Sequence, residues 1–351
     1  MTSTITEEVP KTLPKQQLLH ELSQTVFEYM DPSFRFHLSL HLPSLRSIER
    51  RTHLHIDKLF FYDNEINVNE TMYKLSIDLK YEIEKPPSRI SGTVYRDVDE
   101  FGFETITEDY MMNGDVFINN YRVSIAVEFG RLRLEDEASV LMETIKKKEP
   151  PEFKSILKLT ITPKDGEPRI YKSSEIVTIY EGMKMLIAAI FGSRTVIWTV
   201  EYMQIWTRSL RWIVSGVKPF ARNIQLLRQY SVNSNSLRLI CHPTSFPLKN
   251  LRLELTYHVL DQEVLLDAEN VLFYSCSTTW NVSLMSQLVK ISHLKVQIFR
   301  ISKYVFADLM HFWLQHEKPV GTNPSKWQWD HPQYYPFPMV TQYTMIMLTD
   351  E

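Results

Sequence analysis

The sequence predicts an α+β fold with a short helical unit at the N-terminus, an antiparallel strand-rich middle and an irregular, leucine-rich-repeat-like β/α array at the C-terminus. Three observations support this prediction. Apolar residues recur every three or four residues near the N-terminus, then at every second residue, and finally in short runs that begin 20 to 27 residues apart. These periods are typical of amphipathic helices, half-buried strands and stacked strand–helix units.

The composition is that of a globular protein without a basic excess. Of 351 residues, 44% are hydrophobic, 12% aromatic and 23% charged, which excludes a disordered or collagen-like chain. At about 150 residues per domain, this length allows two domains or one large one. The formal net charge is -3, from 39 Lys and Arg against 42 Asp and Glu, so nucleic acid is not an expected partner.

Cysteine content and hydropathy favour an intracellular protein. Cys241 and Cys276 are too few for a disulfide framework or for a zinc site built from thiolates. Residues 1–10 lack the basic and apolar regions of a signal peptide. The most apolar run, residues 185–191, is too short to span a bilayer. We therefore expect a cytoplasmic protein, with the nucleus as the alternative, and no membrane partner.

Residues 12–50 are expected to form three short helices after a disordered, polar lead over residues 1–11. Pro32 ends the first helix, because its ring disfavours helical geometry at the preceding residue. A second helix begins near Phe34, and Pro43 begins a third. The apolar positions of the first helix are Leu18, Leu19, Leu22, Val26, Phe27 and Met30.

Residues 51–133 are expected to be rich in strands. Apolar and polar residues alternate from Leu54 to Leu79, and turn-prone pairs divide this segment, which predicts a small antiparallel meander. Residues 84–113 are rich in Pro, Asp and Glu and predict a long surface excursion, followed by a return to strand. A charged helix at residues 134–151, with acids first and bases last, is expected to lead into the C-terminal domain.

Short apolar runs in that domain, residues 152–351, predict a strand–helix array. Four runs begin 27, 20 and 23 residues apart, which brackets a leucine-rich-repeat unit although the consensus letters of that repeat are missing. Residues 280–289 and 302–315 predict helices, and the aromatic tail after Gly321 is expected to cover one end. The predicted strands are 196–200, 224–227, 237–240, 251–255, 271–274 and 294–299.

Two further patterns bear on structure rather than chemistry. Trp206, Leu210 and Ile213 recur at helical intervals, so residues 206–213 predict an amphipathic helix whose arginines face water. The nine glycines stand alone, which fits turns and helix ends and disfavours a phosphate-binding loop.

We expect no metal, no cofactor and no enzymatic activity. His53 and His55 would share a strand face, but no third ligand converges on them, and His311 and His316 would diverge on a helix. Both cysteines are interpreted as buried thiols, because neither lies in a known catalytic context.

Asp97 and Asp99 are interpreted as part of a solvated turn with aromatic residues packed beneath it. A hydrolase that uses Asp97, Asp99 or Cys241 remains a third hypothesis, because a single sequence does not show which side chains meet in space.

Most of the chain resembles a nematode-expanded family of uncharacterised proteins with a degenerate F-box-like start and an F-box-associated-type region of unknown function. The segments that carry the resemblance are Phe34–Arg50, Leu54–Leu59, Ile66–Asn69, Thr71–Leu75, Asp97–Phe103, Asn113–Asp115, Trp313 and Val320–Thr322.

This resemblance implies a partner. An F-box docks on the Skp-type linker subunit of a cullin-RING ubiquitin ligase and leaves the C-terminal domain to select a target protein. Residues 42–46 depart from the usual basic and aromatic ending of the motif. The positions implied to dock the linker are Leu13, Pro14, Leu18, Leu22, Val26, Met30, Pro32 and Phe34.

Two functions therefore follow from the sequence. The first is a non-enzymatic adaptor that binds a ligase linker through residues 12–50 and a target through the C-terminal array. The second is a structural or immune-type binding protein with no ligase connection, in which the first helices belong to the core. The two differ in whether the apolar stripe of the first helix meets another polypeptide.

Overall fold

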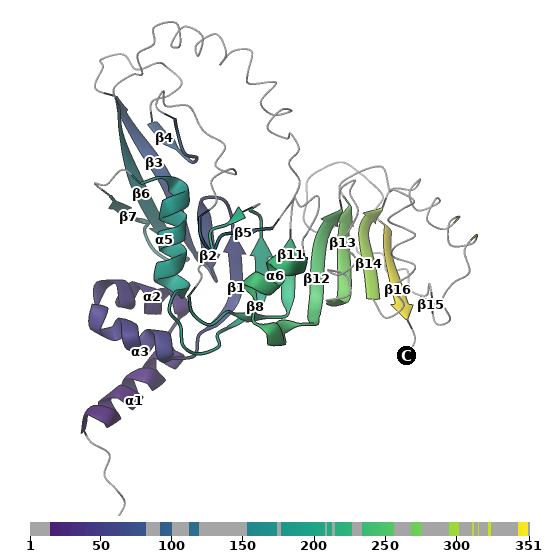
Figure 1. The fold of residues 1–351 in the computed structure, drawn as a ribbon, viewed down its shortest axis with the longest axis horizontal. Coiled ribbons are helices and arrows are strands. Elements are labelled where there is room, and N and C mark those ends of the chain that lie inside the picture. The colour runs from purple at the N-terminus through teal and green to yellow at the C-terminus, as the bar shows by residue number, and fades with distance from the viewer. Residues whose placement is uncertain are drawn as a thin grey trace, which may run out of the picture.

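The computed structural model has a mixed α/β fold with one large sheet and few helices among its described residues (Figure 1). This confirms the mixed class expected from the sequence. The described residues are 15–81, 92–99, 112–118, 153–173, 177–207, 209–212, 215–226, 234–255, 268–275, 295–301, 311, 315, 322–323 and 343–349.

The N-terminal helices form where the sequence predicts them. The break after the first helix falls at Asp31, whose carboxylate accepts hydrogen bonds from the backbone N–H groups of Ser33 and Phe34, while Pro32 occupies the first turn of the second helix. The elements are α1 (Lys15–Glu28), α2 (Pro32–His41), the 3-10 helix η1 (Pro43–Leu45) and α3 (Arg46–Arg51).

One half of the sheet is antiparallel and begins with the expected meander. Asn69 turns the chain between the second and third strands in a left-handed conformation, with φ of 53°. The strands of this half are β1 (His55–Phe61), β2 (Glu65–Val68), β3 (Thr71–Tyr81), β4 (Gly92–Val94), β6 (Phe153–Thr162) and β7 (Arg169–Lys172). β3 pairs with β6 along residues 72–81, so the sheet runs across the boundary expected near residue 150.

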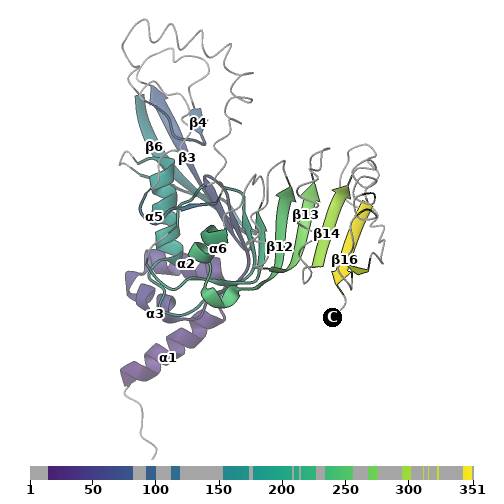
Figure 2. The ribbon, with the colours of Figure 1, turned by 45° about the vertical axis from the view of Figure 1, so that its right-hand side comes forward.

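The other half of the sheet is mainly parallel and grows from the opposite edge of β1. Successive strands lie side by side in chain order, each parallel to its neighbour, until β16 returns antiparallel (Figures 1 and 2). The elements are β8 (Thr199–Ile205), β10 (Phe220–Ala221), β11 (Asn223–Leu226), β12 (Leu248–Leu255), β13 (Ala268–Ser275), β14 (Lys295–Ile301), β15 (Thr322–Asn323) and β16 (Tyr343–Thr349).

Neighbouring strands in this half share one pattern, in which a buried apolar residue is followed by two outward residues, a second buried residue, one outward residue and a third buried residue. On β1 the buried residues are Ile56, Leu59 and Phe61. The register places their counterparts in the same rows. These are Val200, Met203 and Ile205 on β8; Ala221, Ile224 and Leu226 on β10 and β11; Leu248, Leu251 and Leu253 on β12; and Ala268 and Val271 on β13.

Helices α5 (Ile179–Phe191) and α6 (Ser234–Ile240) contribute to the same core as these buried rows. α6 is followed by the 3-10 helix η3 (Pro243–Ser245). The predicted strand at residues 237–240 is wrong, because this segment lies in α6. Leu237 and Ile240 are three residues apart and share a buried helical face, a spacing that a four-residue run does not distinguish from a strand.

The predicted helix at residues 206–213 is also wrong for the residues that the structure describes there. Ser209 and Leu210 form strand β9, which pairs with β5 (Val116–Phe117) in a small separate sheet. Arg211 is buried instead of facing water, because its Nη1 donates to Asp115 Oδ2 at 2.9 Å. An ion pair distant in sequence therefore overrides the helical spacing.

Some predictions lie outside the described residues. They concern the lead at residues 1–11, the strand after residue 118, the helices at 134–151 and 280–289, most of the helix at 302–315, Cys276 and the aromatic tail.

Candidate functional site

Large apolar side chains are exposed along α1 and at the start of α2. Leu22, Val26 and Tyr29 follow a spacing of four and three residues, so they lie along one side of the helix and its C-terminal end. Their exposed fractions are 54%, 58% and 89%, and Phe34 is 52% exposed. α1 extends away from the sheet (Figure 1). We call these four residues the α1–α2 apolar face.

The other residues implied to dock a linker are placed differently. Pro32 is buried, and Met30 is half-buried. Leu18 lies in the first part of α1, and Leu13 and Pro14 precede the described residues. The structure thus places three of the eight implied residues, Leu22, Val26 and Phe34, on the α1–α2 apolar face.

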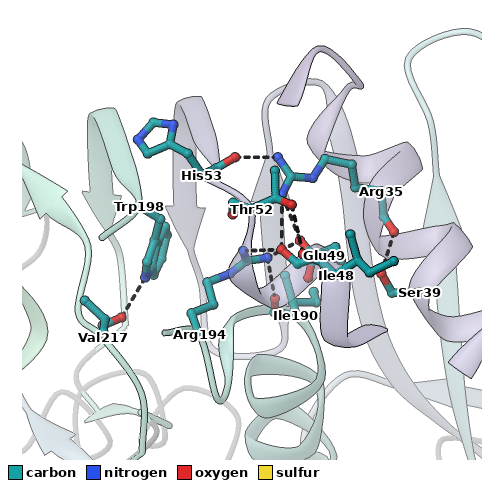
Figure 3. Close-up of polar contacts among 10 residues, drawn as sticks. All are labelled: Arg35, Ser39, Ile48, Glu49, Thr52, His53, Ile190, Arg194, Trp198 and Val217. Carbon is teal, nitrogen blue, oxygen red and sulfur yellow. Dashed lines mark hydrogen bonds and ion pairs between the residues drawn. The ribbon is translucent and has the colours of Figure 1, made fainter. Parts of the chain in front are cut away.

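A buried ionic cluster joins α2 and α3 to the rest of the protein (Figure 3). Glu49 on α3 forms ion pairs with Arg35 on α2 and with Arg194, which follows α5. Arg35 also donates to the carbonyl oxygens of His53 at 2.8 Å and Thr52 at 3.4 Å. The cluster therefore joins α2, α3 and the end of α5.

Burial governs the electrostatics of this cluster. Desolvation lowers the pKa of Arg35 to about 10 and also lowers the pKa of Arg194, although Glu49 opposes both shifts. Two guanidinium groups share one carboxylate, and among the described residues Nε of each arginine has no hydrogen-bond partner. The cluster is consequently sensitive to the loss of Glu49.

Aromatic contacts extend the core into the same helices. The ring of Phe36 on α2 meets Phe191 at a centroid distance of 6.0 Å, and Phe191 stacks on Trp198 at 4.9 Å. Phe27 of α1 is buried as well. The helical unit is therefore joined to the core through Phe27, Phe36 and the buried cluster, while Leu22, Val26, Tyr29 and Phe34 remain exposed.

The outward residues of the parallel strands form a second surface, which we call the array face. On the array face, asparagine side chains form hydrogen bonds between neighbouring strands. Asn223 Nδ2 donates to the carbonyl oxygen of Glu201 at 2.8 Å, and Asn270 Nδ2 makes the same bond to Lys249 at 2.7 Å. Asn250 Nδ2 donates to Asn223 Oδ1 at 2.6 Å. These bonds hold the array face in a fixed register.

Tyr202 lies on the array face and contacts side chains from three other strands. Its hydroxyl donates to Gln225 Oε1, and its ring meets Phe60 at 6.0 Å. The guanidinium group of Arg252 lies 5.5 Å from the same ring centroid. Sequence reasoning missed this group because it depends on the register of four strands.

Asp97 and Asp115 form hydrogen bonds with helix α5. The prediction that Asp97 lies in a solvated turn is wrong. Asp97 is buried rather than solvated, because it accepts hydrogen bonds from the backbone N–H groups of Ile179 at 2.5 Å and Tyr180 at 3.4 Å. Burial raises the pKa of Asp97. Asp115 accepts from Lys184 at 2.5 Å and from Arg211 at 2.9 Å. Both carboxylates are occupied by structural contacts of α5.

The remaining candidates for catalysis or metal binding show no sign of either role among the described residues. Cys241 is buried, and burial raises the pKa of its thiol to about 12. No group of three or more His, Cys, Asp or Glu side chains that could hold a metal ion occurs among the described residues. Within that same part of the chain, no helix is both long and apolar enough to cross a membrane.

Residues 178–325 match the family model of a domain of unknown function, DUF3557. The match begins at the N-cap of α5 and includes the parallel strands β8 to β14, and it supports the expected region of unknown function. No curated protein and no solved structure matches the chain significantly.

Proposed function

We propose that this chain is a non-enzymatic interaction protein that serves as a substrate-recognition adaptor of a cullin-RING ubiquitin ligase. In this proposal the α1–α2 apolar face docks the Skp-type linker subunit, and the leucine-rich-repeat-like array binds the target protein. The single observation that carries the proposal is the exposure of Leu22, Val26, Tyr29 and Phe34 on a helical unit whose inner side is fixed to the body.

Physical chemistry supports the docking half of this proposal. Apolar surface gains about 25 cal/mol for each Å² removed from water, so an exposed apolar stripe favours association. Residues spaced like Leu22, Val26 and Tyr29 are typical anchors of a helix that lies in a partner's groove. The F-box-like order of the helices favours a ligase linker as that partner.

The array supports the recognition half. Parallel strands in chain order, with repeated buried rows, are the arrangement in which leucine-rich repeats present a continuous outer surface. The hydrogen bonds of the asparagine side chains keep the array face rigid. A rigid surface loses little conformational entropy on binding a partner.

A binding measurement with a purified Skp-type linker subunit tests the docking half. We expect the wild-type chain to bind the linker, and Leu22→Asp and Val26→Asp to weaken binding by at least about tenfold, because each buries a carboxylate in an apolar contact. Leu239→Asp on α6 is the matched control, because Leu239 is 53% exposed and remote in sequence. A wild-type chain that does not bind the linker would overturn the ligase role.

One observation favours the second candidate, a structural or immune-type binding protein with no ligase connection. Arg35, Phe36 and Glu49 are all buried, so α2 and α3 contribute to the core whether or not they also dock a partner. In that case the wild-type chain and the Leu22→Asp variant would both fail to bind the linker.

A further inference from the structure

The outward side of α2 carries two histidines beside the exposed ring of Phe34. Phe34, His37 and His41 are spaced by three and four residues, so they lie along one side of the helix. The buried residues Arg35 and Phe36 occupy the other side. The rings of His37 and His41 meet edge to face, with their centroids 4.3 Å apart. The α1–α2 apolar face therefore continues along α2 into a pair of imidazoles.

Strand β7 brings a guanidinium group to the same pair. Arg169 Nη1 lies 2.9 Å from His37 Nε2. Tyr171, on the same side of β7 as Arg169, meets the His41 ring at a centroid distance of 6.5 Å. His41 and Arg169 are exposed, and His37 is half-buried, so these groups lie at the surface. We call His37, His41 and Arg169 the α2–β7 basic cluster.

The hydrogen bond between Arg169 and His37 requires a neutral imidazole. A guanidinium group has no acceptor, so Arg169 donates and His37 Nε2 accepts. Protonation of His37 would remove this acceptor and place two cations in contact. Burial lowers the pKa of His37, and His41 and Arg169 lower it further. An anion beside these groups would relieve the repulsion that accompanies protonation.

No carboxylate among the described residues completes the cluster. None lies within ion-pair distance of its three members, and this includes Asp165 and Glu167 in the turn between β6 and β7. In the same part of the chain, Nη2 and Nε of Arg169 have no hydrogen-bond partner. Two adjacent N–H groups of a guanidinium fork match the two oxygens of a carboxylate. A carboxylate from outside would therefore satisfy donors that the described chain leaves open.

We infer that the α2–β7 basic cluster is an anion site that receives a carboxylate of the protein docked on the α1–α2 apolar face. An acidic side chain of that protein would lie on Arg169, and an apolar side chain beside it would meet Phe34. The inference rests on the proposed function in naming the linker as that protein. Anion binding and protonation of His37 should strengthen each other, because the two added charges attract.

Nuclear magnetic resonance of the histidine side chains in the full-length protein tests the site without a partner. Acetate is the probe, with sulfate as a second anion and chloride holding the ionic strength constant. We expect acetate to raise the pKa of His37 and to bind more tightly as the pH falls from neutral to mildly acidic. His37→Gln identifies the signal and should remove most of this dependence on pH. The signal of His242, whose Nδ1 accepts from the backbone N–H of Thr244, should not respond.

Substitution of Arg169 tests the guanidinium group. Arg169→Gln should weaken acetate binding by at least about threefold, and Arg169→Lys, which keeps the charge without the fork, should retain part of the affinity. The matched control is Lys164→Gln, which removes one positive charge from the turn of the same hairpin, where Glu70 already pairs with Lys164. It should bind acetate as the wild type does.

Three results would overturn the inference. The first is a His37 signal that responds to neither anion, and the second is equal acetate binding in Arg169→Gln and Lys164→Gln. The third is a response to sulfate without one to acetate, which would exclude a carboxylate and indicate a phosphate group instead.

The purified linker separates this result from the ligase role. Arg169→Gln should weaken linker binding by at least about threefold relative to Lys164→Gln. Linker binding that is the same in both variants would overturn the assignment of the carboxylate to the linker. Linker binding without a response of His37 to acetate would overturn this inference alone. Acetate binding in a wild-type chain that does not bind the linker would overturn only the ligase role.

Discussion

At the residue scale, Glu49 holds together segments that are far apart in the chain. It pairs with Arg35 and with Arg194, a residue 145 positions away. Breaking a buried ion pair by removing one partner costs about 3 to 5 kcal/mol, because the remaining charge is left without compensation. Here two guanidinium groups would be left at once.

We therefore predict that Glu49→Gln lowers the free energy of unfolding by about 3 to 5 kcal/mol. The variant keeps the size of the side chain and removes its charge. Urea unfolding followed by circular dichroism measures the change. Glu70→Gln is the control, since Glu70 pairs with Lys164 at an exposed site and its loss should not shift the midpoint. Equal midpoints for the two variants would show that the cluster contributes no stability.

Single residues were the hardest part of the structure to predict from the sequence. Nothing in the acidic stretch around Asp97 indicates that this carboxylate folds onto the N-terminus of α5, 82 positions later. The pairing of Arg35, Glu49 and Arg194 has no local signal either. Such contacts depend on tertiary placement, whereas propensity and periodicity report only near neighbours.

At the element scale, α5 depends on a glycine whose role the sequence did not indicate. Isolated glycines were expected at turns and helix ends, yet Gly182 lies inside α5. A Cβ atom there would lie 2.9 Å from Leu75 Cδ1 and 2.9 Å from Leu157 Cδ2. Gly182 therefore lets α5 pack closely against β3 and β6.

Gly182→Val should lower the free energy of unfolding by about 1 to 3 kcal/mol, the usual cost of overpacking a filled core. Ala189→Val tests the same helix at an exposed position and should change stability much less. Thermal melting of the three proteins provides the comparison. A Gly182→Val protein as stable as the wild type would mean that α5 can move away from the sheet without cost.

Elements with a clear period were predicted well. α1 to α3 and the β1–β3 meander follow the helical and alternating patterns directly, and Asp31–Pro32 marks the break between α1 and α2. The strands expected at 224–227, 251–255, 271–274 and 294–299 are confirmed, since each overlaps one of the strands β11 to β14. Their three-position buried pattern was not predicted, because alanine, a small residue, fills its first position at Ala221 and Ala268. Its rows become visible only when the register is known.

At the scale of the whole molecule, the helical unit is continuous with the body. Removal of residues 1–50 would take away Arg35, Phe36 and Glu49, and would leave Arg194 without its carboxylate and Phe191 without the ring of Phe36. This deletion therefore does not separate a docking module from a core element.

We predict that the deletion of residues 1–50 yields aggregated protein, whereas the deletion of residues 1–20 preserves a folded monomer with a cooperative melt. Size-exclusion chromatography and thermal melting report both outcomes. The shorter deletion leaves Phe27 and the buried cluster in place. A soluble, cooperatively melting protein that lacks residues 1–50 would show that the helices fold separately from the sheet.

The placement of β1 between β2 and β8 also constrains how the chain acquires its shape during translation. His55 lies beside Thr199, which the ribosome adds 144 residues later. At about 5 to 20 residues per second, the unpaired backbone edge of β1 must wait several seconds or more for its parallel neighbour. Until β8 has been synthesised, the backbone N–H and C=O groups along that edge of the early meander have no strand to pair with.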